Sequence, residues 1–321
     1  MRAWILRFAL ALVAWSLAGA AAGQYPTHAI RLIVGIPPGG APDIAARVVG
    51  EKLGALLGQP VVVENHAGSN GNIAGDMVAK APPDGYTLCL CQDSIVAVNP
   101  HLYRSMPFDA LKDLLPVATI AQNQFVLSVN PSLPVKTFSE FIEYARRARP
   151  PLAYASGGNG SQHHLAMEML KQRAGIDLLH VPFKGGSPAT TATVAGETAT
   201  MFSGTSTAPM IKAGKLRALA VTGARRSREF PDLPTIGEFY PGYEVTIWLG
   251  LFAPAGTPDA VIQRLRTEVG RALTDPGVIA RLASAGGLEP MVTTPEAFTA
   301  LIRSDYDKYG KIVHDVGAHV D

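Results

Sequence analysis

Short apolar runs alternate with amphipathic segments along the chain, and Gly, Pro, Asn or Asp stands at most of the joins between them. The apolar runs predict strands at 30–34, 60–64, 86–91, 115–120, 125–129, 152–155, 178–182, 198–202, 216–222 and 247–253. The segments between them predict helices. Strands that alternate with helices are typical of an α/β protein with mostly parallel sheets.

Two late helices show the pattern most clearly. The first spans 258–274, with Thr257 as its cap, Pro258 in its first turn and apolar residues on one face. The second runs from Pro295 to about Val313 with the same apolar spacing. We expect both helices to be packing elements without chemistry of their own.

The first 23 residues have the composition of a signal peptide. Arg2 and Arg7 precede or flank a short apolar run from Phe8 to Leu17, and the small residues Ala18-Gly19-Ala20 follow it. The apolar run is short for a membrane span, which needs about 20 residues. We therefore expect an exported, periplasmic protein with 1–23 removed, although an uncleaved anchor stays open.

The chain that remains after the leader is long enough for two ordinary domains. No internal repeat or low-complexity linker separates them, so a division must come from topology. The segment 152–222 repeats a strand, a small-residue loop and a helix three times, which is enough for a second sheet. We expect lobe 1 to comprise 24–123 plus 243–321 and lobe 2 to comprise 124–242. The alternative is one continuous doubly wound sheet of around ten strands, which is less usual.

The charge balance excludes nucleic acid as a partner. The chain has 28 Lys and Arg against 26 Asp and Glu, and removal of Arg2 and Arg7 leaves 26 of each. Basic and acidic residues are interspersed, without the clustered basic face that binds phosphate backbones. We expect a monomer in solution.

The cysteines and histidines do not indicate a metal site or a cofactor. Cys89 and Cys91 point to the same face of an expected strand, a geometry that rarely closes a disulfide, so we interpret both as small buried apolar residues. His164 and Glu168 share a helix face, but the second histidine of a His-Glu-x-x-His site is missing. We expect no bound metal, and His164 to cap or pack beside its loop.

The most informative segment is the join between the first strand and the first helix. Here the apolar run 30–34 leads into a Pro-Pro-Gly-Gly sequence, residues 37–40, which we call the first glycine loop. A helix that starts directly after such a loop leaves backbone N–H groups unpaired, and these groups bind anions. Asp43 follows the loop and is expected to cap the helix or to tie the loop down.

A second join has the same character. Residues 156–161, which we call the second glycine loop, read Ser-Gly-Gly-Asn-Gly-Ser between a strand and a helix that begins at Gln162. Ser161 is a plausible N-cap, and the helix dipole favours negative charge there by about 0.3 to 1 kcal/mol. Alone, the loop is equally compatible with an ordinary tight turn. Two such loops on two lobes favour a ligand, because ligands of open α/β sheets bind beyond the carboxyl ends of strands.

Three further segments are expected on the same rim, and all are rich in short donors: 92–94, 184–187 and 203–207. Lys184 brings the only formal positive charge among them, and a charge-assisted contact is worth about 1.5 to 3 kcal/mol, although an ordinary surface lysine is as compatible with the pattern. Asp93 opposes a bound carboxylate unless it points away or accepts a hydrogen bond from a hydroxyl or ammonium group of the ligand.

The ordered motifs of the chain resemble the periplasmic solute-binding proteins of tripartite tricarboxylate transporters, also called the Bug family. The shared blocks are the Pro-Pro-Gly-Gly-x-x-Asp loop, Gln-Pro-Val-Val-Val-Glu-Asn at 59–65, Gly-Asn-Ile at 71–73, Pro-Asp-Gly-Tyr-Thr-Leu at 83–88, Asn99-Pro100, the second glycine loop through His164-Leu165, Val-Pro-Phe-Lys-Gly at 181–185, Ala-Gly-Lys-Leu-Arg-Ala-Leu-Ala at 213–220 and Ala-Pro-Ala-Gly-Thr-Pro at 253–258. Each block is weak alone, but their common order covers the mature chain.

The resemblance implies a two-lobed Venus-flytrap fold of the α/β class, in which each lobe is a mostly parallel sheet flanked by helices. It implies that the segments 37–43 and 156–161 hold the carboxylate of a small organic acid, which the protein presents to the permease subunits of a membrane transporter. The chain departs from the family pattern at Asp93, where Ser, Thr or Gly is usual, and at Ser203, near where many members carry Asp.

The ligand-binding residues that follow from these considerations are Pro38, Gly39, Gly40, Asp43, Asp93, Ser94, Ser156, Gly157, Asn159, Gly160, Ser161, His164, Lys184, Gly185, Thr205 and Ser206. We expect no catalytic residue, because the Gly-x-Ser-x-Gly, phosphate-loop and Gly-x-Gly-x-x-Gly motifs of the competing enzyme classes are absent. A binding protein that serves a membrane sensor in place of a transporter remains a second alternative, and the solute is not identified.

Overall fold

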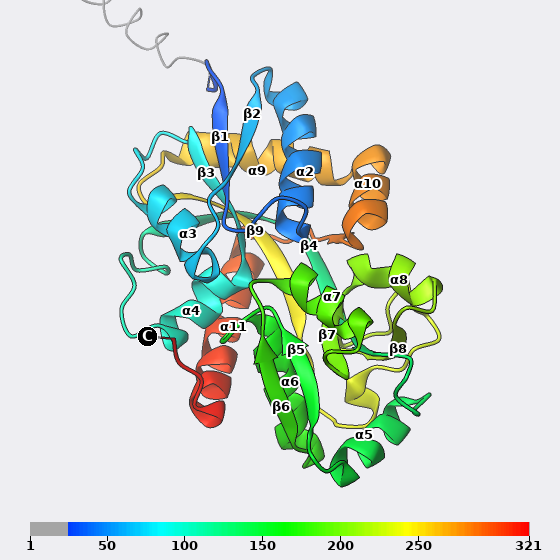
Figure 1. Cartoon of the computed structure of the whole chain (residues 1–321). Helices are drawn as coiled ribbons and strands as arrows, with labels where there is room; N and C mark the ends of the chain where they lie inside the picture. Colours follow the sequence, from blue (N-terminus) through cyan, green and yellow to red (C-terminus); the bar gives the residue numbers. More distant parts are fainter. Residues whose placement is uncertain (1–24, 321) are drawn as a thin grey trace, which may run out of the picture.

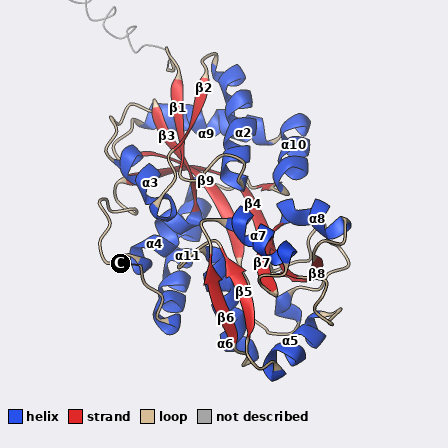
Figure 2. Cartoon of the chain, in the orientation of Figure 1, coloured by secondary structure: helices blue, strands red, loops and turns tan. Residues whose placement is uncertain are grey.

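The structure is a computed structural model in which residues 25–320 are described. The expected signal peptide lies outside the described residues and stays a prediction. Figure 1 shows two lobes, one above the other, with two long strands running through the middle of the molecule. In Figure 2, helices cover the strands of both lobes from the outside.

The strands are β1 (Ile30–Val34), β2 (Val61–Asn65), β3 (Thr87–Gln92), β4 (Leu114–Val129), β5 (Leu152–Ser156), β6 (Leu178–Pro182), β7 (Thr200–Gly204), β8 (Arg217–Val221), β9 (Thr246–Pro254) and β10 (Glu289–Pro290). The α-helices are α2 (Ala41–Leu57), α3 (Asn72–Ala79), α4 (Asn99–Leu102), α5 (Phe138–Arg147), α6 (Gln162–Ala174), α7 (Gly186–Ala195), α8 (Ala208–Lys212), α9 (Asp259–Leu273), α10 (Pro276–Gly286) and α11 (Pro295–Val316). Short helical turns are η2 (Ser69–Gly71), η3 (Ser94–Val98), η4 (Thr205–Thr207) and η5 (Ile236–Glu238).

The expected alternation of strands and helices is confirmed, with one correction. The segments 115–120 and 125–129 are a single strand, β4, because the polar residues between them still pair with β9: Gln122 opposite Trp248, Asn123 opposite Ile247 and Gln124 opposite Thr246. The polar run interrupts the apolar pattern in the sequence but not the hydrogen-bonded ladder. The length of β4 lets it reach both lobes.

The sheet changes its partners along β4. Strand β1 pairs in parallel with β2 and β3 in the upper lobe, and β5 pairs in parallel with β6 and β7 in the lower lobe. Residues 114–124 of β4 pair with β9, whereas residues 125–129 pair with β7 and β8. All pairs that involve β4 or β9 are antiparallel. The hydrogen-bonded path is therefore continuous, but the parallel strands form two separate groups.

Each lobe has its own hydrophobic core, and a smaller cluster joins them. The upper core gathers around β1, β3, β9, α2 and α9, and the lower core around β4, β5, α5 and α6. In the joining cluster, Leu165 of α6 packs with Leu102 of α4 and with Tyr309 and Val313 of α11. Helix α6 of the lower lobe is thus held against the upper lobe through apolar contacts.

The start of α9 differs from the expectation. Pro258 occupies the N-cap position without a side-chain hydrogen bond, and the Thr257 hydroxyl donates to the Pro254 carbonyl at 2.8 Å. Thr257 therefore stabilises the turn before the helix instead of capping the helix. The last helix, α11, reaches Val316, three residues beyond the expected end.

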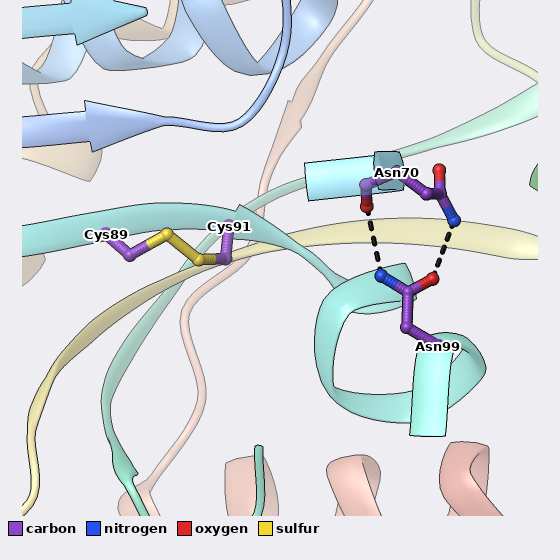
Figure 3. Close-up of a disulfide and its surroundings, with 4 residues drawn as sticks. All are labelled: Asn70, Cys89, Cys91 and Asn99. Atoms are coloured by element: carbon purple, nitrogen blue, oxygen red, sulfur yellow. Dashed lines mark hydrogen bonds between the residues drawn. A yellow bond between two sulfur atoms is a disulfide. The ribbon is translucent and has the colours of Figure 1, made fainter. Parts of the chain in front are cut away.

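The interpretation of the two cysteines as unpaired is wrong, although their expected burial is confirmed. Cys89 and Cys91 form a disulfide within β3, in the upper lobe (Figure 3). An extended strand separates Cα atoms two residues apart by about 6.6 Å, whereas these Cα atoms are 5.4 Å apart. Both distances lie within the range that a disulfide bridges, and the observed one is close to the commonest separation of about 5.5 to 6 Å.

Candidate functional site

The joins between strands and helices that carry the two glycine loops lie in the middle of the molecule. The β1–α2 join of the upper lobe and the β5–α6 and β6–α7 joins of the lower lobe all approach the level where the lobes meet (Figure 1). Each join follows the carboxyl end of a parallel strand, which is where α/β sheets bind ligands. The topology therefore brings the two predicted loops to the same region.

The first glycine loop is held by a buried carboxylate. Asp43 is 3% exposed and accepts hydrogen bonds from the Gly39 amide at 2.9 Å and from the Asn65 side-chain amide at 2.9 Å. Arg47 completes the set with an ion pair at 2.9 Å. Burial raises the pKa of Asp43, but the hydrogen bonds from Arg47, Gly39 and Asn65 outweigh it, so the pKa lies below its ordinary value. Asp43 ties the loop down, while Gly40 occupies the N-cap position of α2.

The start of α2 still offers donors. The Ile44 amide makes the first bond of the helix, to the Gly40 carbonyl at 3.0 Å. The amides of Ala41 and Asp43 therefore lie in the first turn of the helix, where backbone amides have no hydrogen-bond partner within the helix. The Gly39 amide, in contrast, already binds Asp43. The loop therefore offers fewer free amides than its glycines predict.

The second glycine loop satisfies many of its own polar groups. The buried Ser156 hydroxyl accepts from the Gly158 amide at 3.0 Å and lies 2.6 Å from Nε2 of His180. Ser161 caps α6 by accepting from the His164 amide at 3.4 Å, as its position predicts. The Gly160 amide donates to Nδ1 of His164 at 3.1 Å, which confirms that this histidine packs beside the loop. Only part of the loop main chain is left for a ligand.

Glycine is required at Gly160 for two reasons. Its φ of +70° lies in the left-handed region, and a Cβ atom there would stand 2.1 Å from Leu102 of the upper lobe. The loop therefore sits directly against the neighbouring lobe. Gly39 also has a left-handed φ, +88°, but a Cβ atom there would meet open space.

The remaining rim residues differ in exposure. Lys184 is exposed between β6 and α7, and no hydrogen bond or ion pair joins it to the part of the chain that the structure describes. Gly185 is the N-cap residue of α7, and its amide donates to the Gly157 carbonyl at 3.2 Å. The Thr205 hydroxyl donates to the Gly287 carbonyl of the upper lobe at 3.0 Å. Ser206 lies in η4 beside it, and Pro38 and Asn159 are exposed in their loops.

Asp93 lies in a contact between the lobes. Its side chain is fully buried, and its two oxygens accept from the Ser94 amide at 2.9 Å and from the side-chain amide of Gln162 on α6. Burial, and then the charge of Asp305, raise the pKa of Asp93 well above its ordinary value. Both oxygens of this carboxylate therefore already accept hydrogen bonds from the protein.

Sequence reasoning missed the polar residues that hold neighbouring segments in place. Asn70, whose φ is +52°, donates to the Asn99 side-chain oxygen at 2.7 Å, and Asn99 donates back to the Asn70 carbonyl at 3.1 Å (Figure 3). Asn99 also donates to the side chain of Asn72 at 2.6 Å. The Gly71-Asn72 and Asn99-Pro100 blocks were visible in the sequence, but nothing in them indicated that they contact each other.

His163 was also missed. Its ring lies 4.5 Å from that of Phe125 and close to Gly157 and Gly186, at the starts of α6 and α7. Burial lowers its pKa to about 4, so the ring is neutral near pH 7. Such a residue could not be distinguished in the sequence from an ordinary histidine of a helix.

Within residues 25–320, no group of three or more His, Cys, Asp or Glu side chains is placed to hold a metal ion. In the same range, no helix combines the length and the apolar character that a membrane crossing requires. Cavities of about 450 Å³ beside β8 and about 610 Å³ beside α2 and β2 lie away from the two glycine loops.

The chain is similar to known proteins both in sequence and in structure. A family model described as the tripartite tricarboxylate transporter family receptor matches residues 45–318. The protein BugT of Bordetella pertussis is 35% identical over 92% of this chain and 92% of its own. A Rhodopseudomonas palustris protein whose structure was determined with adipate is 34% identical, covers 92% of this chain and 99% of its own, and superposes with a TM-score of 0.86. MatC from Rhodopseudomonas palustris with bound malate is 30% identical over 90% of this chain and 100% of its own, with a TM-score of 0.80.

Proposed function

This chain belongs to the tripartite tricarboxylate transporter receptor family, and we propose that it captures a small organic acid between its two lobes and delivers it to a membrane transporter of the tripartite tricarboxylate type. It is a solute-binding receptor of the Bug type and not an enzyme. The observation that carries the proposal is the approach of two glycine loops, from different lobes, to one region of the molecule.

The proposed site uses the starts of α2 and α6 as donors for the ligand carboxylate. The amides of Ala41 and Asp43 face it from the upper lobe, the exposed Asn159 segment faces it from the lower lobe, and Lys184 supplies the positive charge. The other predicted residues of the two loops act by shaping the main chain. Relatives whose structures contain adipate and malate support a dicarboxylate as the ligand class.

The proposed mechanism needs no covalent step. With the lobes apart, the donors bind water, and a ligand that contacts both lobes favours the closed arrangement by its higher affinity for it. A micromolar affinity corresponds to about 8 kcal/mol, which a few charge-assisted contacts and desolvation can supply. The lobes comprise 24–123 plus 243–321 and 124–242 in this proposal, with the two crossings of the chain as the hinge.

Export through the signal peptide 1–23 and handover to permease subunits complete the proposed function. Family membership supports both, and family members are known as periplasmic binding proteins. A role as the ligand-binding partner of a membrane sensor is the alternative, since the same capture step serves either.

The test is a thermal-shift and calorimetry experiment on the mature protein with adipate and malate. A ligand that binds only the folded state raises its melting temperature, and we expect at least one of the two acids to do so without being consumed. Lys184→Ala should weaken binding by about 10-fold or more, because a hydrogen bond to a charged group is worth about 1.5 to 3 kcal/mol.

Lys215→Ala is the matched control, because Lys215 is an exposed lysine of the same lobe and lies outside the loops. Equal losses in both variants would contradict the assignment of Lys184. Turnover of the bound acid would contradict the receptor role itself.

A further inference from the structure

Three rings from three different elements stack beside the second glycine loop. The ring of His180 on β6 lies between those of Tyr154 on β5 and His164 on α6. The ring centroids are 4.9 Å apart on the tyrosine side and 4.1 Å apart on the histidine side, with interplanar angles of 18° and 10°. We call these three residues the ring stack.

Both histidines of the ring stack bind the loop. His180 reaches the Ser156 hydroxyl at the beginning of the loop with Nε2, at 2.6 Å, and His164 accepts from the Gly160 amide near its end with Nδ1, at 3.1 Å. The tyrosine anchors the other end of the stack, because its hydroxyl donates to Glu168 at 2.6 Å. The shape of the loop therefore depends on both imidazole rings.

This arrangement requires a neutral His164, and it disfavours a charge on His180 beside it. A nitrogen that accepts a hydrogen bond from a backbone amide cannot carry a proton, and two stacked cations 4.1 Å apart would repel. The charged groups that face the stack are Glu168 and Lys171, both on α6, and they pair with each other at 2.9 Å. The carboxylate of Glu168 is therefore already paired with Lys171 and is not free to stabilise a protonated histidine of the ring stack.

The electrostatics agree with the geometry. Burial, and then His164, lower the pKa of His180 from 6.5 to about 4, and burial lowers the pKa of His164. Because the pKa of His180 is lower when the loop is ordered, protonation of His180 opposes the ordered loop. The ordered loop is therefore fully stable above pH 6.5, the ordinary pKa of histidine, and it loses stability as the pH falls from 6.5 toward 4.

We propose that the neutral pair His164 and His180 positions the second glycine loop for ligand binding, and that protonation of the pair in acid frees the loop and weakens the hold on the ligand. The two histidines are positioning residues, since they act through the loop. The part of this inference that concerns the ligand rests on the proposed function, whereas the part that concerns the loop does not.

The loop is tested first without ligand, by hydrogen exchange of the Gly160 amide and by nitrogen NMR of the imidazoles. For His180, with a pKa of 6.5 in the open loop and about 4 in the ordered loop, linkage makes the equilibrium constant for loop opening about 20-fold higher at pH 5 than at pH 7. We expect exchange protection, corrected for the intrinsic rate, to fall by about this factor. We also expect Nδ1 of His164 to be unprotonated at pH 7.

Substitutions at His164 and His180 separate the effect of the charge from the effect of the hydrogen bond. His164→Asn keeps an acceptor oxygen near the position of Nδ1 and does not titrate, so it should retain protection at pH 7 and show a smaller fall at pH 5. The double variant with His180→Gln should show almost no fall. His164→Leu removes the acceptor and should lose protection at both pH values. His314→Asn is the matched control, because the side chain of His314 is 88% exposed.

A second experiment tests the effect on the ligand. It compares the affinity of the wild type and of the double variant His164→Asn, His180→Gln for adipate and malate at pH 7 and pH 5. Because both proteins are compared at the same pH, the titration of adipate and malate themselves cancels. The affinity of the wild type should fall more between pH 7 and pH 5 than that of the double variant. Equal pH profiles, a protonated Nδ1 at pH 7 or an unchanged exchange fall in the double variant would overturn the inference. If neither acid binds at pH 7, the proposed function fails, while the exchange experiment still decides the inference.

Discussion

The two glycine loops have the same local pattern in the sequence but are held in place by different physics. The first loop is exposed and is tied by the charged set Asp43, Arg47 and Asn65. The second loop lies against the opposite lobe and is tied by uncharged groups, the Ser156 hydroxyl and the rings of His164 and His180. The same local pattern, a strand followed by glycines and a helix, therefore does not determine what restrains the loop or how it responds to pH.

The largest expected effect comes from Gly160→Ala, which breaks the contact of the second loop with the upper lobe. Overpacking against Leu102, at 2.1 Å from the added Cβ, and the left-handed φ together should destabilise the protein by about 2 to 4 kcal/mol. Urea unfolding measures the change. Gly39→Ala is the matched control in the first loop, where only the backbone term of about 1 kcal/mol applies. Equal losses would show that the second loop does not pack as described.

A smaller effect is expected for Asp43→Asn, which removes the charge that holds the first loop. Loss of the charge-assisted hydrogen bonds should lower the free energy of unfolding by about 1 to 3 kcal/mol at pH 7. Because the folded pKa of Asp43 is lowered, its contribution is present above the unfolded value of 3.8 and is lost as the pH falls through the folded value. The difference between wild type and variant should therefore vanish in acid.

Asp109→Asn is the control for that measurement, since Asp109 is exposed and also has a lowered pKa. A variant at Asp43 that unfolds like the wild type at pH 7 would show that the charged set does not stabilise the loop.

Asp93→Asn is expected to have a smaller effect of the opposite sign. The raised pKa of this buried carboxyl group means that the folded state takes up a proton, so stability falls as the pH rises from 3.8 through the folded value, with a slope of up to about 1.4 kcal/mol per pH unit. Asparagine does not titrate, so it removes this dependence of stability on pH. The side-chain amide of Gln162 can rotate so that its oxygen accepts a hydrogen bond from the new amide group. We expect a gain in stability at pH 7 and none at pH 3.

Melting temperatures of the Asp93 variant measured across this range check the sign. A loss of stability at neutral pH would show that the carboxylate is held charged by its partners, as Asp43 is. The two aspartates thus differ as a buried carboxylate with an ion-pair partner, Asp43, differs from a buried carboxyl group with neutral partners, Asp93.

Features that depend on neighbours along the chain could be predicted from the amino-acid sequence. The alternation of strands and helices, the glycines before α2 and α6, the Ser161 cap and the ordered family motifs all follow from short segments, because local apolar spacing and backbone freedom encode them. The two-lobed fold followed from those motifs through the resemblance.

Which donors of the candidate site are still available, and which buried charges are stable, could not be predicted without the folded structure. The Gly39 and Gly160 amides are already taken by Asp43 and His164. Asp93 binds Gln162, 69 residues away in the chain, and Cys89 and Cys91 are joined by a disulfide that their spacing did not predict. Hydrogen-bond partners and burial depend on segments that meet only after folding, and these two quantities set the pKa of a side chain and the donors left for a ligand.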